Sequence, residues 1–116
     1  MSRLLRACVN SWNGLIAATR SEAAFRQELA LLVISVPLAL LITPDPWKRL
    51  GLWAVLLLVL VVELLNTAIE KLADQLTTTM HPGIGRIKDM GSAAALLALI
   101  IAGLFWLTAI AERLWQ

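Results

Sequence analysis

Acidic side chains recur at helical spacing near the middle of this 116-residue chain, where a long apolar stretch ends. At 100° per residue, Glu63, Glu70 and Asp74 fall within about 40° of one another, and Asn66 lies about 60° to one side. Carboxylates at the edge of a membrane helix cost free energy, which makes them candidates for function. They also repel one another unless a cation intervenes. Mg²⁺ is the obvious cation, because it binds carboxylate oxygens and commonly bridges to substrate phosphates.

Ion pairing with arginines or lysines of neighbouring helices is the alternative explanation of this acidic face. Glu63 has no basic residue within seven positions on either side, so its free-energy cost needs another explanation. A general base at the membrane surface would supply one. For Asp74 the two explanations are evenly matched, and Lys71 lies off the acidic face.

The segment from Gly83 to Ser92 contains glycines, an arginine, a lysine and an aspartate at the start of an apolar stretch. Backbone N–H groups in such a segment, together with the start of the next helix, would cradle a phosphate. A charged turn that anchors the next span is the alternative, because the segment has neither a Walker pattern nor a complete GxGxxG. His81 is the only histidine and does not predict a metal site. Cys8 has no partner for a disulfide within the chain.

The composition predicts that lipid surrounds most of the chain. Apolar residues make up 59% and charged residues 16%, with a mean hydropathy of +0.79, whereas soluble domains are about 45–50% apolar and 25% charged. This excludes a disordered tail, a secreted disulfide scaffold and most soluble single-domain enzymes. The formal net charge of +2 is too small to indicate a nucleic-acid partner. We therefore predict an all-α membrane protein.

A single domain over residues 1–116 is predicted, with one surface helix followed by three membrane spans. Residues 1–20 carry an apolar stripe at helical spacing with arginines outside it, which suits a helix lying in the membrane plane. Thr43–Pro46 predicts a turn, and a polar loop is expected from about residue 75 to residue 90. No cleavable signal peptide is expected within the first 28 residues. The predicted spans cover residues 23–43, 50–70 and 92–112.

The basic residues predict the orientation of these spans in the membrane. Seven fall on one side, namely Arg3, Arg6, Arg20, Arg26, Lys71, Arg86 and Lys88. Three fall on the other side, namely Lys48, Arg49 and Arg113. Because cytoplasmic segments carry the excess of Lys and Arg, the N-terminus and the segment 71–90 are expected in the cytoplasm.

Three segments, Glu22–Glu28, Glu63–Glu70 and Lys88–Ala94, resemble the small integral-membrane prokaryotic diacylglycerol kinases in sequence, order and spacing. The resemblance extends over nearly the whole chain. It implies ATP- and Mg²⁺-dependent transfer of the γ-phosphoryl group to the hydroxyl of diacylglycerol, giving phosphatidic acid. It also implies a homotrimeric bundle of three-span protomers, each with a surface helix, in the bacterial inner (cytoplasmic) membrane.

The resemblance also implies roles for particular residues. Glu63 would take the proton of the lipid hydroxyl, with Asn66 close by, and Glu22 and Glu70 would hold the metal. Contacts to ATP would come from Arg3, Glu22, Glu70, Asp74, His81, Lys88 and Asp89. The lipid site would be formed by Arg26, Glu28, Glu63, Ser92 and Trp106. The chain departs from the family's usual pattern at Arg6, Asn10, Asn13 and residues 77–80.

Three other functions are alternatives to a diacylglycerol kinase. A kinase of the same fold that acts on undecaprenol is the nearest, because lipid choice depends on a groove between spans. The segment Asp89–Ala93 resembles the diacylglycerol branch more closely. A small proton-coupled multidrug exporter would have four spans, whereas three are predicted here. A structural or regulatory membrane subunit has no positive support in the sequence.

Overall fold

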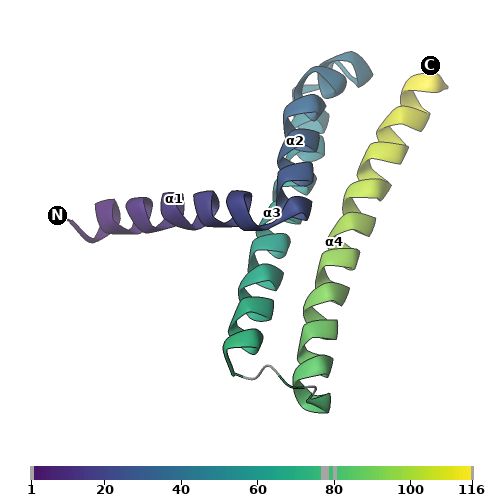
Figure 1. The fold of residues 1–116 in the computed structure, drawn as a ribbon. Coiled ribbons are helices and arrows are strands. Elements are labelled where there is room, and N and C mark those ends of the chain that lie inside the picture. The colour runs from purple at the N-terminus through teal and green to yellow at the C-terminus, as the bar shows by residue number, and fades with distance from the viewer. Residues whose placement is uncertain (1, 77–78, 80, 116) are drawn as a thin grey trace.

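The computed structural model describes residues 2–76, 79 and 81–115, and these residues form four helices without any strand (Figure 1). The predicted all-helical fold is confirmed. Three of the helices are long and apolar enough to cross a membrane. In chain order the helices are α1 (Arg3–Ser21), α2 (Ala23–Ile42), α3 (Pro46–Leu76) and α4 (Pro82–Leu114).

Helix α1 runs across the direction of the other three helices (Figure 1). The side chain of Ser2 caps its start by accepting a hydrogen bond from the backbone N–H of Leu5 at 3.2 Å. Its apolar side chains, such as Leu4 and Trp12, are exposed. Only its C-terminal part is packed, where Ala18 is buried together with neighbours from α2 and α3. An exposed apolar stripe on a helix of this orientation is typical of one that lies on a membrane surface.

The elbow between α1 and α2 is fixed by Glu22 and Arg26. Glu22 has an extended backbone (φ −121°, ψ 114°), which ends α1. One guanidinium nitrogen of Arg26 donates to the backbone carbonyls of Thr19 at 2.9 Å and Arg20 at 3.2 Å. These carbonyls belong to the last turn of α1 and lack partners within the helix. Arg26 therefore holds α1 at a set angle to α2.

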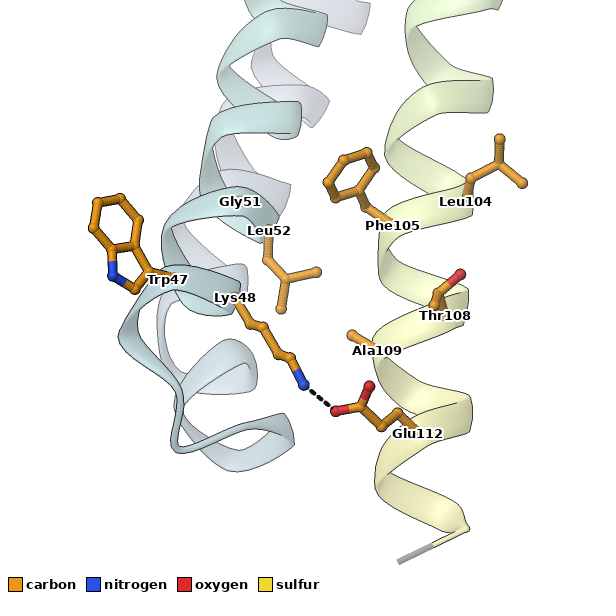
Figure 2. A pocket seen from close by; sticks show the side chains of 9 residues that line it. All are labelled: Trp47, Lys48, Gly51, Leu52, Leu104, Phe105, Thr108, Ala109 and Glu112. Carbon is orange, nitrogen blue, oxygen red and sulfur yellow. Dashed lines mark hydrogen bonds and ion pairs between the residues drawn. The ribbon is translucent and has the colours of Figure 1, made fainter.

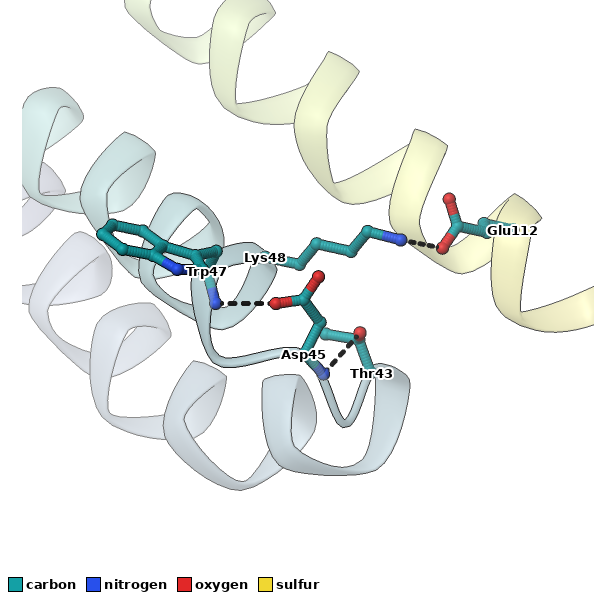
Figure 3. A network of polar contacts seen from close by, with 5 residues as sticks. All are labelled: Thr43, Asp45, Trp47, Lys48 and Glu112. Atoms are coloured by element: carbon teal, nitrogen blue, oxygen red, sulfur yellow. Dashed lines mark hydrogen bonds and ion pairs between the residues drawn. The ribbon is translucent and has the colours of Figure 1, made fainter.

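The turn between α2 and α3 is closed by side chains at both of its ends (Figure 3). Asp45 caps α3 by accepting a hydrogen bond from the N–H of Trp47 at 2.9 Å, and Thr43 Oγ1 accepts one from the N–H of Asp45 at 3.2 Å. Arg49 reaches back to the end of α2, donating to the carbonyls of Thr43 at 2.7 Å and Leu40 at 3.2 Å. The predicted turn at Thr43–Pro46 is thereby confirmed.

Replacing Arg49 with alanine is expected to lower the free energy of unfolding by about 1–2 kcal/mol, because two carbonyls at the end of α2 lose their donor. Arg113→Ala, in the exposed last turn of α4, is the matched control, with an expected change within about 0.5 kcal/mol. Unfolding in detergent micelles, followed by helical circular dichroism, measures both. Equal effects of the two substitutions would show that the cap contributes nothing.

Helices α3 and α4 lie side by side over most of their length and form the largest contact of the fold (Figure 1). Their shared core contains Val55, Val59, Ala98 and Ala102. With 31 and 33 residues, they are about 46 and 50 Å long, whereas the hydrocarbon core of a bilayer is about 30 Å thick. Both helices therefore continue beyond the bilayer, and Figure 1 shows them extending past the level of α1.

The prediction of a loop from residue 75 to residue 90 is wrong for most of this segment. Helix α3 continues to Leu76, and α4 begins at Pro82. Pro82 begins α4 instead of interrupting a helix, because proline is favoured in the first helical position, where it has no N–H to leave unpaired. Of the predicted departure from the family at residues 77–80, only Thr79 lies within the described residues.

Candidate active site

The acidic face of α3 lies where the surface helix meets the bundle. The C-terminal half of α1 packs against Leu60 and Leu64, and a cleft of about 470 Å³ between α1 and α3 extends from Leu64 to Lys71. Along α3, Glu70 falls within this range and Glu63 directly precedes it. They are separated by seven residues, or about 10 Å along the helix axis. Glu63 is thus nearer the middle of α3. Glu70 is nearer its C-terminal end, the end that projects past the level of α1.

Four carboxylates from three parts of the fold, Glu22, Glu28, Glu63 and Glu70, interact through their charges at this level. The charges of Glu70 and Glu22 act on Glu63, and the charge of Glu63 acts on Glu28. Glu22 comes from the elbow and Glu28 from the next turns of α2. All four are half-buried, and Glu28 Oε2 is a buried oxygen without a hydrogen-bond partner among the described residues. Such a group of like charges favours the binding of a cation.

Lys71 is the basic side chain that approaches this group most directly within the described residues. Its Nζ lies 3.8 Å from Glu22 Oε1 and donates to Ser21 Oγ at 2.8 Å. Glu28, Glu63 and Glu70 have no ion pair with any described residue. Pairing with Lys71 therefore accounts for part of the charge of Glu22. The charge of Lys88 acts on Glu70 without forming an ion pair, so Glu28 and Glu63 are the two carboxylates that no described basic side chain compensates.

The carboxylates of this group are of the chemical type that binds Mg²⁺. Within the described residues, no three side chains of His, Cys, Asp or Glu are arranged closely enough to enclose a metal. Mg²⁺ is usually held by one or two carboxylates, with substrate phosphates and waters completing the octahedron. Glu22 and Glu70, which both act on Glu63, supply ligands of that kind.

Asn66 occupies the α3–α4 interface between Glu63 and Glu70. Its residue surface is 8% exposed, and Oδ1 is a second buried oxygen without a hydrogen-bond partner among the described residues. On the other side of the interface lies Gly91 of α4. The angle of Asn66 on the helix predicted its place beside the acidic face. Its contact with Gly91 was not predicted, because a contact between two helices has no local signal in the sequence.

Asp74 is paired with Lys88, which is the kind of contact that the ion-pairing alternative predicts for this carboxylate. Lys88 Nζ lies 2.6 Å from Asp74 Oδ1 and joins the projecting ends of α3 and α4. The side chain of Asp74 is 64% exposed, so the pair contributes little to stability. Asp89 is exposed next to Lys88.

His81 is the N-cap of α4, which corrects the predicted phosphate cradle. Its Nδ1 accepts hydrogen bonds from the N–H groups of Gly83 at 3.1 Å and Ile84 at 3.4 Å. The N–H of Gly85 donates to the His81 carbonyl at 2.9 Å. The backbone donors expected to bind phosphate are therefore already used by His81, and the segment is a helix rather than a loop.

The remaining predicted residues are spread more widely. Arg26 is engaged in the elbow, and Ser92 is exposed on α4 next to Gly91. Trp106 donates from Nε1 to the Leu52 carbonyl at 3.1 Å and lines an apolar groove of about 290 Å³ between α2, α3 and α4. Arg3 lies at the free end of α1 (Figure 1), about 28 Å from the elbow along the helix. One chain does not bring Arg3 to the carboxylates.

A separate cleft of about 480 Å³ opens between α3 and α4 at the opposite end of the bundle (Figure 2). Its walls are mainly apolar, including Leu52, Leu104 and Phe105, and its charged residues, Lys48 and Glu112, pair with each other. This cleft has no uncompensated carboxylate, unlike the group around Glu63. We therefore assign the chemistry to the end of the bundle near α1.

Comparison with known proteins identifies the family that the chain resembles. The family model for prokaryotic diacylglycerol kinase matches residues 9–110. A diacylglycerol kinase of Escherichia coli (strain K12) is 43% identical over 105 residues, covering 90% of this chain and 86% of the relative. One from Pseudomonas aeruginosa is 44% identical over 108 residues, covering 93% and 88%. One from Haemophilus influenzae is 36% identical over 106 residues, covering 91% and 90%.

Proposed function

The chain belongs to the prokaryotic diacylglycerol kinase family, and from this membership we propose how its residues carry out the reaction. It is an ATP-dependent kinase of diacylglycerol. We place the transfer at the cytoplasmic face of the inner membrane, where phosphatidic acid is formed. The observation that carries this proposal is the group of Glu22, Glu28, Glu63 and Glu70, in which only Glu22 is paired with a described basic residue.

Glu63 is the proposed general base. The lipid hydroxyl gives its proton to the Glu63 carboxylate while the hydroxyl oxygen forms a bond to the γ-phosphorus of ATP. The bond from that phosphorus to the bridging oxygen of the β-phosphate breaks, and ADP leaves with the oxygen. Glu63 suits this role because it is half-buried on the membrane side of the group and has no ion pair with any described residue. Phosphoryl transfer otherwise requires mainly positioning and charge neutralisation.

The proposed nucleotide site lies nearer the projecting end of α3. Glu22 and Glu70 would hold the Mg²⁺ carried by ATP, an ion that when bound neutralises phosphate charge. Lys88 would exchange its bond to Asp74 for one to phosphate. Nδ1 of His81 accepts from the start of α4, so Nε2 is the ring atom that would contact ATP. Asp89 and the free end of α1 at Arg3 would complete the site.

The proposed lipid site runs from Glu28 and Arg26 at the elbow along the spans to Trp106, with Ser92 on the facing helix. The apolar groove beside Trp106 is lined by aliphatic side chains of all three spans, as an acyl chain requires. The diacylglycerol hydroxyl would then lie at the level of Glu63 without leaving the bilayer.

We also propose a homotrimer. Arg3 cannot reach the carboxylates of its own chain, and the carboxylates of a neighbouring protomer would give it a partner. The orientation with the N-terminus in the cytoplasm is supported by the seven basic residues on that side against three on the other.

An assay of purified protein in detergent micelles tests the function. ATP consumption should depend on added diacylglycerol, should yield phosphatidic acid and ADP in equal amounts, and should stop when Mg²⁺ is chelated. Undecaprenol is the control lipid, and faster phosphorylation of undecaprenol would reassign the substrate. ATP consumption without any lipid would contradict the proposed site.

A further inference from the structure

At the point where α4 meets α3, the side chain of Asn66 occupies the space beside Gly91. A Cβ built on Gly91 would overlap Asn66 Oδ1 and would lie 3.3 Å from Asn66 Cγ and 3.9 Å from Asn66 Cα. Gly91 is buried, and Asn66 is buried on the facing helix. The oxygen of Asn66 therefore occupies the space that a side chain at position 91 would fill.

This contact also fixes which end of the amide faces the glycine. The Cα hydrogens of Gly91 carry partial positive charge, and Cα–H···O contacts recur at helix–helix interfaces. Oδ1 has no other partner among the described residues, whereas an NH₂ group turned toward the Cα hydrogens would be repelled. With Oδ1 held against Gly91, the NH₂ group of Asn66 is the part left to donate a hydrogen bond.

Asn66 lies three residues after Glu63 and four before Glu70, so it neighbours both on the surface of α3. We propose that Gly91 is a positioning residue for the kinase reaction, because it orients the Asn66 amide so that the NH₂ group donates to the transferred phosphoryl group. This inference rests on the proposed function in one respect, namely that Asn66 acts at the reaction site.

Gly91→Ala tests the inference, because its methyl group must turn the short Asn66 side chain away. A displacement of about 1 Å near the reacting groups costs about 10²-fold in rate, so kcat should fall by that factor. The KM values for ATP and diacylglycerol should change by less than about threefold, since the amide acts in the transition state. Gly51→Ala, at the opposite end of α3, is the matched control, because a Cβ there would make only ordinary contacts of 3.8 and 3.9 Å with the Phe105 side chain. It should leave kcat within about twofold.

A double-mutant cycle with Asn66→Ala separates this inference from the proposed function. If Gly91 acts through Asn66, the single variants lose similar activity, and Gly91→Ala causes no further loss in the Asn66→Ala background. A full additional loss in that background would overturn the inference and leave the role of Asn66 intact. Normal activity of Asn66→Ala would overturn both the role of Asn66 and any action of Gly91 through it.

Folding is measured by helical circular dichroism and thermal unfolding on the parent, the two single variants Gly91→Ala and Asn66→Ala, and the double variant. If Gly91→Ala unfolds, the double variant should recover its helical signal, because the side chain that collides with the new methyl group is gone. A double variant that stays unfolded would show that Asn66 is not what Gly91 accommodates, and the inference would be rejected.

Discussion

Glu63→Gln is expected to lower kcat for diacylglycerol phosphorylation by about 10²- to 10⁴-fold, the range that a positioned general base contributes. Glutamine keeps the shape of the side chain but cannot take the hydroxyl proton. The variant should also unfold at the same temperature as the parent or a higher one, because one of four mutually repelling carboxylates is removed. Loss of activity without loss of stability is the expected signature.

The control for this prediction is Glu112→Gln, the same change on α4 at the opposite end of the bundle. It breaks the pair with Lys48 (Figure 3) and touches no residue of the proposed site. Its kcat should stay within about twofold of the parent. Turnover of both variants is measured in mixed micelles at saturating ATP and lipid. Near-normal turnover of Glu63→Gln would exclude Glu63 as the base.

Glu70→Gln is expected to reduce activity by about 10²-fold at a Mg²⁺ concentration that saturates the parent, because one proposed ligand of the ion is lost. Raising Mg²⁺ should restore part of the activity, since a weaker site fills at a higher concentration. The measurement is a Mg²⁺ titration at fixed ATP, and its midpoint should move upward. An unchanged midpoint would show that Glu70 does not hold the ion, and Glu112→Gln again serves as the control.

Mixing these two variants tests whether protomers share a site. Glu63 and Glu70 are about 10 Å apart along α3, which is long for a base and a metal ligand acting on one phosphoryl group. If Glu63 of one protomer works with Glu70 of another, trimers reassembled from both inactive variants regain part of the activity. Absence of recovery after reassembly would assign both residues to one chain.

The acidic face was predictable because all its members belong to one helix. Within a helix the angle between residues is fixed, so the spacing of Glu63, Glu70 and Asp74 determines their common face. The partner of each residue was not predictable in the same way. Lys71 lies off the acidic face of its own helix, yet its side chain reaches Ser21 and Glu22 at the elbow. The angle between α1 and α3 decides that contact, and no local pattern encodes it.

The start of α4 was predicted wrongly for a related reason. Proline and glycines at positions 82, 83 and 85 resemble a loop when considered singly. The ring of His81 satisfies the first free N–H groups, and this makes the same residues the first turn of a helix. The contact between Asn66 and Gly91 was unpredictable because it depends on the register between α3 and α4, set by the core around Val59 and Ala98.

With the site placed as we propose, the extension of α3 and α4 past the surface helix means that donor and acceptor arrive from different phases. ATP would reach the projecting ends by three-dimensional diffusion through water, while the lipid would reach the level of Glu63 by two-dimensional diffusion. The rate should then follow the mole fraction of diacylglycerol in the micelle or bilayer rather than its bulk concentration. Adding inert detergent at constant total lipid would slow the enzyme by surface dilution, and the product would leave sideways into the leaflet.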